Sequence, residues 1–174
     1  MTLTILRVTP EEWRSHRDLR LEMLQAAPDA FYTRYADVAG FDEDTWRERL
    51  ATQCHFQARL DGDPVGSVGI WDDPETPADA STLVAMYVVP RARGAGVGER
   101  LVQAVVDEAA RRGRSRVVLE VTETNLPARR LYERMGFVLD GTRKPLPHTP
   151  ELDELGMERV LETRLPTSGD DVGG

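Results

Sequence analysis

The chain has 174 residues, 40% of them hydrophobic and 30% charged, which is typical of one soluble globular domain. Its formal charge is −8 and its isoelectric point is near 5.0, which argues against a general nucleic-acid binder. A single cysteine excludes an internal disulfide framework, and no apolar run approaches the roughly 18 residues that span a membrane. With no secretory signal pattern at residues 1–10, we expect a cytoplasmic protein without a membrane partner.

The first third of the chain predicts a strand, two helices and a loop. Residues 2–8 alternate as a strand does, and Thr9 then caps a helix that runs to about residue 25. Residues 26–40 are predicted to form a loop, because prolines and glycine interrupt them and few apolar anchors remain. Residues 42–51 predict a second, short helix.

Strands dominate the middle of the chain. Residues 55–60 and 64–71 are joined by Asp61-Gly62-Asp63, and Asp-Gly between apolar runs is a strong hairpin signal. Residues 72–80 read as a loop, and residues 82–89 predict another strand, which ends at a proline. No acidic residue lies on that strand.

The last third alternates helices and strands. Residues 98–112 predict an amphipathic helix, residues 116–121 a largely apolar central strand, and residues 125–135 a final helix. Two more strands are predicted at 137–140 and 155–161.

This order mixes antiparallel hairpins with one strand–helix–strand crossover, so the class is α/β, with an α+β-type mixed sheet. We expect one domain over residues 1–162. Residues 163–174 are polar and glycine-rich, and they predict a disordered tail.

Charge is distributed unevenly along the chain. Residues 90–144 carry 12 basic and seven acidic residues, a net +5, which leaves −13 for the remainder. A basic zone suits an anionic ligand and an acidic one suits a cationic ligand. Solvated helix faces are the alternative explanation.

The most informative segment is the turn between residues 82–89 and residues 98–112. Its glycines alternate: Gly94, Gly96 and Gly98. Glycine lets the backbone approach an anion closely, and the first N–H groups of a helix then point at that anion. The segment predicts a pyrophosphate-binding turn, with a plain strand-to-helix turn as the alternative.

Two nucleotide-binding motifs compete for this turn. A P-loop requires Gly-Lys-Ser/Thr, and Gly98 is followed by Glu99 and Arg100 instead, which excludes it. A dinucleotide fingerprint requires G-x-G-x-x-G and an acid about 20 residues later. Glu120 lies 22 residues beyond Gly98, but it is inside its predicted strand, and the turn follows at least three strands. An NAD site is therefore disfavoured.

At this point the sequence resembles the GNAT superfamily of N-acetyltransferases. The family's acyl-CoA motif is Gln/Arg-x-x-Gly-x-Gly/Ala after a strand, and residues 93–98 (Arg-Gly-Ala-Gly-Val-Gly) fit every position. A second family motif begins with Asn and ends in Leu-Tyr-x-x-x-Gly-Phe, as residues 125–137 do. The resemblance covers residues 2–161. It implies a GNAT-like acyl-CoA N-acyltransferase fold with about seven strands and about four helices.

The resemblance implies acetyl-CoA as co-substrate. It assigns the pyrophosphate to the backbone of the glycine turn, the pantetheine arm to the end of the preceding strand, and further contacts to the last helix. The implied cofactor-binding residues are Tyr87, Val88, Val89, Arg93, Gly94, Ala95, Gly96, Val97, Gly98, Glu99, Asn125, Arg129 and Tyr132.

The resemblance also implies the catalytic groups. Tyr132 matches the family tyrosine that protonates the departing thiolate, with core packing as the alternative role. Glu120 is the candidate base, because a carboxylate on an apolar strand is costly without a reason. Pairing of Glu120 with an Arg across the sheet, or deprotonation through ordered water, stays open. Asp72 and Asp73 are weaker candidates.

The acceptor site is implied to lie between residues 26–40 and the last hairpin, at residues 142–155. Phe31, Tyr32 and Trp71 are candidate acceptor-binding residues there, with ordinary core packing as the alternative. The histidines and Cys54 show no ligand spacing, so no metal is expected.

The sequence therefore predicts an acetyl-CoA-dependent N-acetyltransferase that acts on a primary amine. The acidic remainder of the chain favours a cationic small molecule as acceptor. A peptide N-terminal amine is the first alternative and a non-catalytic acyl-CoA-binding sensor the second. The resemblance also allows a homodimer.

Overall fold

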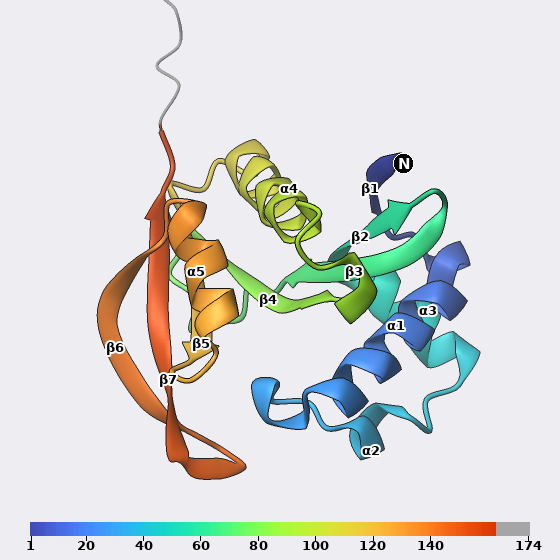
Figure 1. Ribbon diagram of the computed structural model, residues 1–174, viewed down its shortest axis with the longest axis horizontal. Coiled ribbons are helices and arrows are strands. Elements are labelled where there is room, and N and C mark those ends of the chain that lie inside the picture. The colour runs from blue at the N-terminus through green and yellow to red at the C-terminus, as the bar shows by residue number, and fades with distance from the viewer. Residues whose placement is uncertain (163–174) are drawn as a thin grey trace, which may run out of the picture.

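The computed structural model describes residues 1–162, and its strands form one seven-stranded sheet (Figure 1). The strands are β1 (Leu3–Arg7), β2 (Cys54–Leu60), β3 (Asp63–Ile70), β4 (Ala80–Val88), β5 (Arg116–Thr122), β6 (Val138–Leu146) and β7 (Thr149–Val160). Their order across the sheet is β1-β2-β3-β4-β5-β7-β6, and only β4 and β5 pair in parallel. The tail predicted at residues 163–174 lies outside the described residues.

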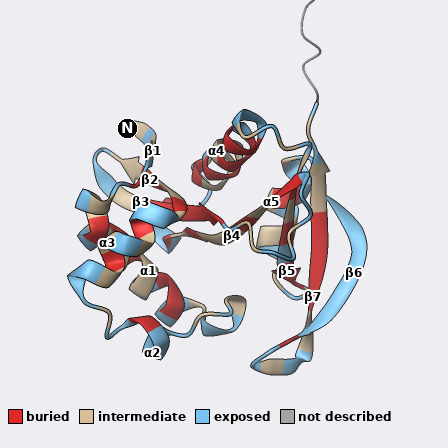
Figure 2. Cartoon of the chain, turned by 180° about the vertical axis from the view of Figure 1, so that it is seen from behind, coloured by how far each residue is buried: buried red, intermediate tan, exposed pale blue. Residues whose placement is uncertain are grey.

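Helices cover both faces of this sheet. They are α1 (Trp13–Ala26), α2 (Tyr35–Val38), α3 (Glu43–Thr52), α4 (Val97–Arg111) and α5 (Leu126–Arg134). Helix α4 packs on one face of β1–β4, while α1, α2 and α3 lie on the other face (Figures 1 and 2). No helix among the described residues is long and apolar enough to cross a membrane.

The core lies between α4 and the sheet and between the sheet and α1. Every apolar residue expected on the inner side of α4 is buried: Leu101, Val102, Val105, Val106 and Ala109. Full burial of a Val or Leu side chain contributes about 1.5–3 kcal/mol, so this face alone anchors the helix firmly. Figure 2 shows the same pattern, with buried residues on the inner sides of α4 and α1.

The sequence prediction of a mixed sheet with flanking helices is confirmed. The hairpin at Asp61-Gly62 is also present, and both residues have positive φ (51° and 93°), as a tight two-residue turn between twisted strands requires.

Two boundaries were predicted wrongly. The last two strands were predicted too short, at residues 137–140 and 155–161, whereas β6 continues to Leu146 and β7 begins at Thr149. The sheet ends at β6, whose residues are nearly all exposed, so an alternation of buried and exposed residues is missing from its sequence. The predicted loop at residues 26–40 also contains the single turn of α2.

The two halves of the sheet separate between β4 and β5. These strands pair only at their starts, from Ala80 opposite Arg116 to Thr82 opposite Val118. Further along, β4 carries a bulge against β3, where Ala85 has a left-handed φ of 55°. Bulges bend a strand and redirect its backbone, and here the bulge lies where β4 has left β5. The fold thus leaves an opening in the middle of its own sheet.

Candidate active site

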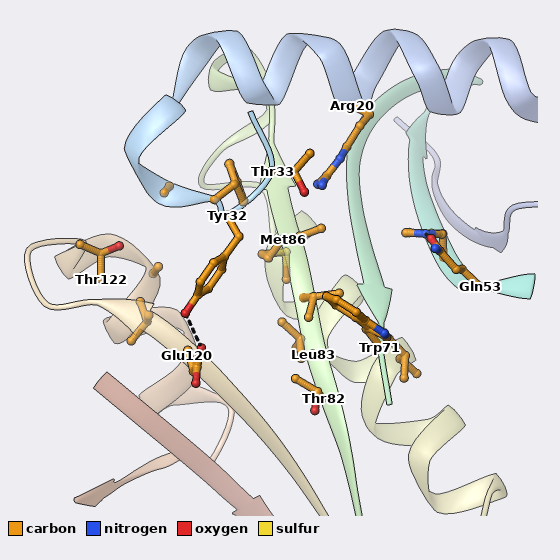
Figure 3. A pocket seen from close by; sticks show the side chains of 18 of the residues that line it. Arg20, Tyr32, Thr33, Gln53, Trp71, Thr82, Leu83, Met86, Glu120 and Thr122 are labelled. Atoms are coloured by element: carbon orange, nitrogen blue, oxygen red, sulfur yellow. Dashed lines mark hydrogen bonds between the residues drawn. The ribbon is translucent and has the colours of Figure 1, made fainter. Parts of the chain in front are cut away.

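A cavity of about 400 Å³ lies at the opening between β4 and β5. Its lining comes from α1, α2, α3 and α5, from residues 30–33, from strands β2 to β5, and from β7. Figure 3 shows β4 crossing it, with Tyr32 and Glu120 on one side and Trp71 and Gln53 on the other. Arg20 reaches into it from α1. A volume of this size is typical of small-molecule sites.

The glycine turn forms the start of α4. Gly94 and Gly96 have left-handed φ values of 79° and 77°, which L-residues adopt only with strain. A Cβ added to either glycine would meet nothing within 4 Å, so open space lies in front of the turn. Within residues 1–162, the N–H groups from Gly94 to Gly98 have no hydrogen-bond acceptor. They are unpaired donors at the positive end of a 15-residue helix, which suits an anion.

The same turn packs against α5. A Cβ on Gly98 would come within 2.9 Å of Leu131 Cδ2, so glycine is needed there for the close approach of the two helices. Glu99 and Arg134 form an ion pair of 2.9 Å between the same helices. The turn is thereby adjacent to the helix that carries Tyr132 to the cavity.

Tyr132 lies on the cavity wall and is 5% exposed. Its ring packs against Phe137, with ring centroids 5.8 Å apart. Its hydroxyl has no hydrogen-bond partner among the described residues, and burial raises its pKa above the ordinary value of 10.0. The phenol is therefore protonated at neutral pH and available as a donor.

Two carboxylates and a tyrosine meet on the β5 side of the cavity. The Tyr32 hydroxyl donates a hydrogen bond to Glu154 and lies 3.4 Å from Glu120. Glu120 is 40% exposed and forms an ion pair of 2.6 Å with Lys144. Glu154 is only 5% exposed, and burial, together with the nearby Glu120 carboxylate, raises its pKa above 4.5.

Several of the residues predicted for the site line this cavity. They are Phe31, Tyr32, Trp71, Glu120, Asn125 and Tyr132. Asn125 also caps α5, since its side chain accepts from the Ala128 N–H at 3.3 Å. Trp71 is 62% exposed at the rim, so it is free of the core packing that was the alternative for it.

Other predicted residues lie outside the cavity lining. Tyr87 donates to Glu22 of α1 at 3.3 Å, and Val88 and Val89 pair with or bond to β3. The Arg93 N–H donates to the Pro90 carbonyl, and its guanidinium donates to the Val88 carbonyl at 3.0 Å. Arg129 donates to the Glu123 carbonyl. These contacts hold the turn and the start of α5 in place.

The weaker base candidates have structural partners. Asp72 accepts from Ser81 and from the Thr82 N–H, and it pairs with Arg112 at 3.4 Å. Asp73 accepts from two backbone N–H groups of its own turn. Neither lines the cavity.

Sequence reasoning missed five titratable residues of the cavity: Glu154, His16, Arg20, Arg49 and His55. A signal existed for three of them. His16 and Arg20 fall on the stripe that Trp13 and Leu24 mark as the inner side of α1, and Arg49 lies three residues after the buried Trp46. A charged residue on the inner side of a helix marks a buried polar site. Glu154 gave no such signal, because it lies one residue before the strand that was predicted at residues 155–161.

No group of three or more His, Cys, Asp or Glu side chains within residues 1–162 has the arrangement of a metal site.

Comparison with known proteins gives one family. The family model described as "Acetyltransferase (GNAT) family" matches residues 17–137, more than half of the chain. Among curated proteins, "Probable N-acetyltransferase camello" from Xenopus tropicalis is 40% identical over 85 residues. That match covers 48% of this chain and 38% of the relative, so the chain spans well under two thirds of the relative's length.

Solved structures share the fold over nearly the whole chain. An acetyltransferase of the GNAT family from Streptococcus pneumoniae matches with a TM-score of 0.76 and 22% identity, covering 92% of this chain and 100% of that one. A putative acetyltransferase from Salmonella typhimurium, yncA, solved with its cofactor acetyl-CoA, matches with a TM-score of 0.75 and 19% identity. This match covers 98% of this chain and 100% of that one. At these identities the likeness concerns the fold.

Proposed function

This chain belongs to the acetyltransferase (GNAT) family, and on that premise we propose that it transfers the acetyl group of acetyl-CoA to a primary amine. One observation carries the proposal. Among residues 1–162, the cavity joins a buried phenol without a hydrogen-bond partner to a pair of carboxylates, and the helix that carries this phenol packs against a turn of unpaired N–H groups. Acyl transfer to an amine needs a proton donor, a proton acceptor and an anion cradle, and these three are adjacent here.

The residues of the turn fit acetyl-CoA. The open space in front of Gly94 and Gly96 and the unpaired N–H groups up to Gly98 suit a diphosphate. When bound, acetyl-CoA supplies an acetyl group on a thioester. Beyond Thr82, β4 has no strand partner on its β5 side, so its backbone from Leu83 toward Val89 is available to a pantetheine arm. Ala95, Val97 and Glu99 take part through their backbone.

Tyr132 is proposed as the general acid. The departing thiolate, with a pKa of about 8.5, needs a proton as the carbon–sulfur bond breaks. The Tyr132 hydroxyl is buried at the cavity wall with no hydrogen-bond partner in the described part of the chain, and its raised pKa keeps the proton on the oxygen until then. Asn125 and Ala128, also on the cavity wall, belong to the capped start of the same helix.

The carboxylate pair is proposed to receive the proton of the amine. An amine with a pKa of about 10.4 is almost entirely protonated at pH 7, so reaching the neutral form costs about 4.6 kcal/mol. Glu120 was predicted as base, but its carboxylate is engaged in an ion pair of 2.6 Å with Lys144. Glu154 is better suited, because its pKa is raised and its side chain is buried beside Glu120. We therefore propose Glu154 as the base, with Glu120 beside it.

The negative charge of two carboxylates in the cavity supports a cationic acceptor. Net charge predicted a cationic small molecule, and Glu120 and Glu154 suit an ammonium group near Tyr32. Phe31, which lines the cavity and also packs against the core, and the exposed Trp71 are proposed to contact the rest of the acceptor. A cytoplasmic location and a homodimer remain proposals from the sequence, the latter supported by the exposed Val138 and Leu139 on the edge strand β6.

The test has two arms. Acetyl-CoA is expected to raise the melting temperature by several degrees, while NAD has no effect. Thiol release from acetyl-CoA is then measured with polyamines, amino acids, aminoglycosides and short peptides. Turnover with free amines supports the proposal, whereas turnover with peptides alone supports the N-terminal amine alternative. Binding without turnover across the panel would favour the sensor, and absence of binding would refute the proposal.

A further inference from the structure

Four basic side chains gather at the part of the cavity that α1, α3 and β2 form. His16 and Arg20 come from α1, Arg49 from α3 and His55 from the start of β2. The ring centroids of His16 and His55 lie 4.6 Å apart. Both histidines are close enough to the two arginines for the arginine charges to lower their pKa values. Figure 3 shows the Arg20 side chain pointing from its helix into the cavity, beside Thr33.

The two arginines lack a counter-ion. Neither forms a salt bridge with any residue of the described part of the chain. Within residues 1–162, the only hydrogen bond of the Arg20 guanidinium is to the sulfur of Met23, at 3.6 Å. The Arg49 guanidinium lies over the Phe41 ring, 5.4 Å from its centroid. A partly buried guanidinium without an anion is costly, so this arrangement is unusual unless a ligand completes it.

The positive charge at this place belongs to the arginines. Burial, followed by the neighbouring cations, lowers the pKa of His16 to about 3 and that of His55 to about 4, so both are neutral at pH 7. Burial and Arg49 lower the pKa of Arg20 to about 10, which still leaves it charged. Trp46, on the same wall, has a buried Nε1–H for which the described residues offer no acceptor. The groups offered to a ligand are thus donors and positive charges.

We propose that the acceptor amine also carries a carboxylate, and that Arg20 and Arg49 bind it. The proposal rests on acetyl transfer as the function and names its substrate class: a small zwitterion of the amino-acid type. Its ammonium group lies toward Glu154 and Glu120, and its carboxylate lies toward α1 and α3. The net charge of the chain, which predicted a purely cationic acceptor, misses this because the two arginines are a local exception to the acidic surroundings.

This assignment uses the two kinds of charge in one cavity. Opposite charges at its two parts would orient the acceptor, so that the amine and not the other end meets the carboxylates. Arginine suits a carboxylate because its planar guanidinium can donate two parallel hydrogen bonds. The cavity of about 400 Å³ admits a free amino acid but leaves little room for a folded protein substrate.

Matched pairs of amines test the proposal, because each pair differs only in the carboxylate. L-lysine is compared with cadaverine, L-phenylalanine with 2-phenylethylamine, and L-leucine with 3-methylbutylamine. With acetyl-CoA present, kcat/KM measured by thiol release is expected to be about 10- to 100-fold higher for the amino acid of the preferred pair.

Arg20→Gln and Arg49→Gln are then measured with the preferred pair. Each substitution is expected to raise KM for the amino acid about 10-fold or more. KM for the matched amine without a carboxylate and Kd for acetyl-CoA are expected to stay unchanged. Arg14→Gln is the matched control, since Arg14 is an exposed arginine on the same helix and outside the cavity. Its kinetics are expected to equal those of the unaltered protein.

Equal kcat/KM within every pair, or an equal effect of Arg20→Gln on both members, would overturn the proposal. If neither the amino acids nor the matched amines are acetylated, the proposed function fails. Binding of these compounds to the protein then tests the carboxylate site independently. The melting temperature is then measured with each amine of the pairs at millimolar concentration. Stabilisation by amino acids alone that Arg20→Gln abolishes supports the anion site, and its absence refutes it.

Discussion

At the start of α4, the groups proposed to hold an anion are backbone N–H groups of consecutive residues, Gly94 to Gly98. Near α1 and α3, the groups proposed to hold one are the side chains of Arg20 and Arg49, which are 29 positions apart in the chain. The first region depends on backbone conformation, and glycine is the only residue type it demands. The second depends on two particular side chains and on the packing of two helices.

This difference fits what each region has to bind. A backbone cradle is hard to alter by substitution and suits a ligand that does not vary, as a diphosphate does. A side-chain cradle changes with single substitutions and suits an acceptor that defines one enzyme's specificity. Tyr132, Glu120 and Glu154 line the cavity, and α5, which carries Tyr132, packs against the glycine turn, so both ligands would meet at these three side chains.

The largest effect is expected in the backbone region. Gly96→Asp is predicted to weaken acetyl-CoA binding at least 100-fold in a calorimetric titration, because a carboxylate would stand in the open space where the diphosphate is proposed. Asp is a good helix N-cap, so α4 is expected to form. Gly96→Asn is the matched control, since Asn has the same shape, tolerates a left-handed φ and carries no charge. Equal Kd values for the two variants would contradict binding of a negatively charged diphosphate in front of Gly96.

The next effect concerns the point where the two regions meet. Tyr132→Phe is predicted to lower kcat about 100-fold and to change KM for acetyl-CoA less than threefold, because only the proton donor is lost. The ring would still pack on Phe137, so the melting temperature is a control for folding. An unchanged kcat would make Tyr132 a packing residue.

Glu154→Gln separates the two carboxylates. The pKa of Glu154 is raised, so kcat of the unaltered protein is predicted to increase with pH above the usual range of carboxyl pKa values. In the variant, this increase is expected to be absent and kcat to be about 10- to 100-fold lower. If Glu120→Gln removes the rise instead, Glu120 is the base, as the sequence predicted.

The same substitution has a predicted effect on stability. A carboxyl whose pKa is higher in the folded than in the unfolded state adds stability at low pH and loses it as pH rises through the folded value. At pH 8, Glu154→Gln is therefore expected to raise the melting temperature, by about 2 °C. A lower melting temperature at pH 8 would contradict the direction of this shift.

The smallest effect is expected at the rim. Trp71→Ala is predicted to raise KM for the acceptor a few-fold and to leave the melting temperature unchanged, since 62% of Trp71 is exposed and it contributes little to the core. Thiol-release kinetics and a thermal melt check both parts. A drop of several degrees in the melting temperature would show that Trp71 supports the fold instead.

The sequence predicted the backbone region well because its signal is contiguous. Three alternating glycines after a strand predict both the turn and the helix that follows. The structure has left-handed φ values at Gly94 and Gly96. The apolar stripe of α4 is equally local, and its five expected residues are all buried. Short-range patterns of this kind depend on neighbours in the chain.

The side-chain region could not be predicted in the same way. Arg20 and Arg49 meet only after α1 and α3 pack on the same face of the sheet, and Glu154 meets Tyr32 across 122 positions of sequence. Because β6 is exposed and lacks a pattern of alternating buried residues, the sequence did not reveal how it pairs with β7, the strand that carries Glu154. The inner-side charges on α1 and α3 gave a hint of a buried polar site, but not of its partner.

The most direct test of the whole account is the stoichiometry of the reaction. Acetyl-CoA and the preferred amine are mixed with the protein, and free thiol and acetylated amine are quantified together by absorbance and mass spectrometry. For acetyl transfer to an amine, both products are expected to form in equal amounts, and thiol release is expected to stop when the amine is omitted. Thiol release at the same rate without an amine, or an amine left unmodified while thiol accumulates, would contradict it.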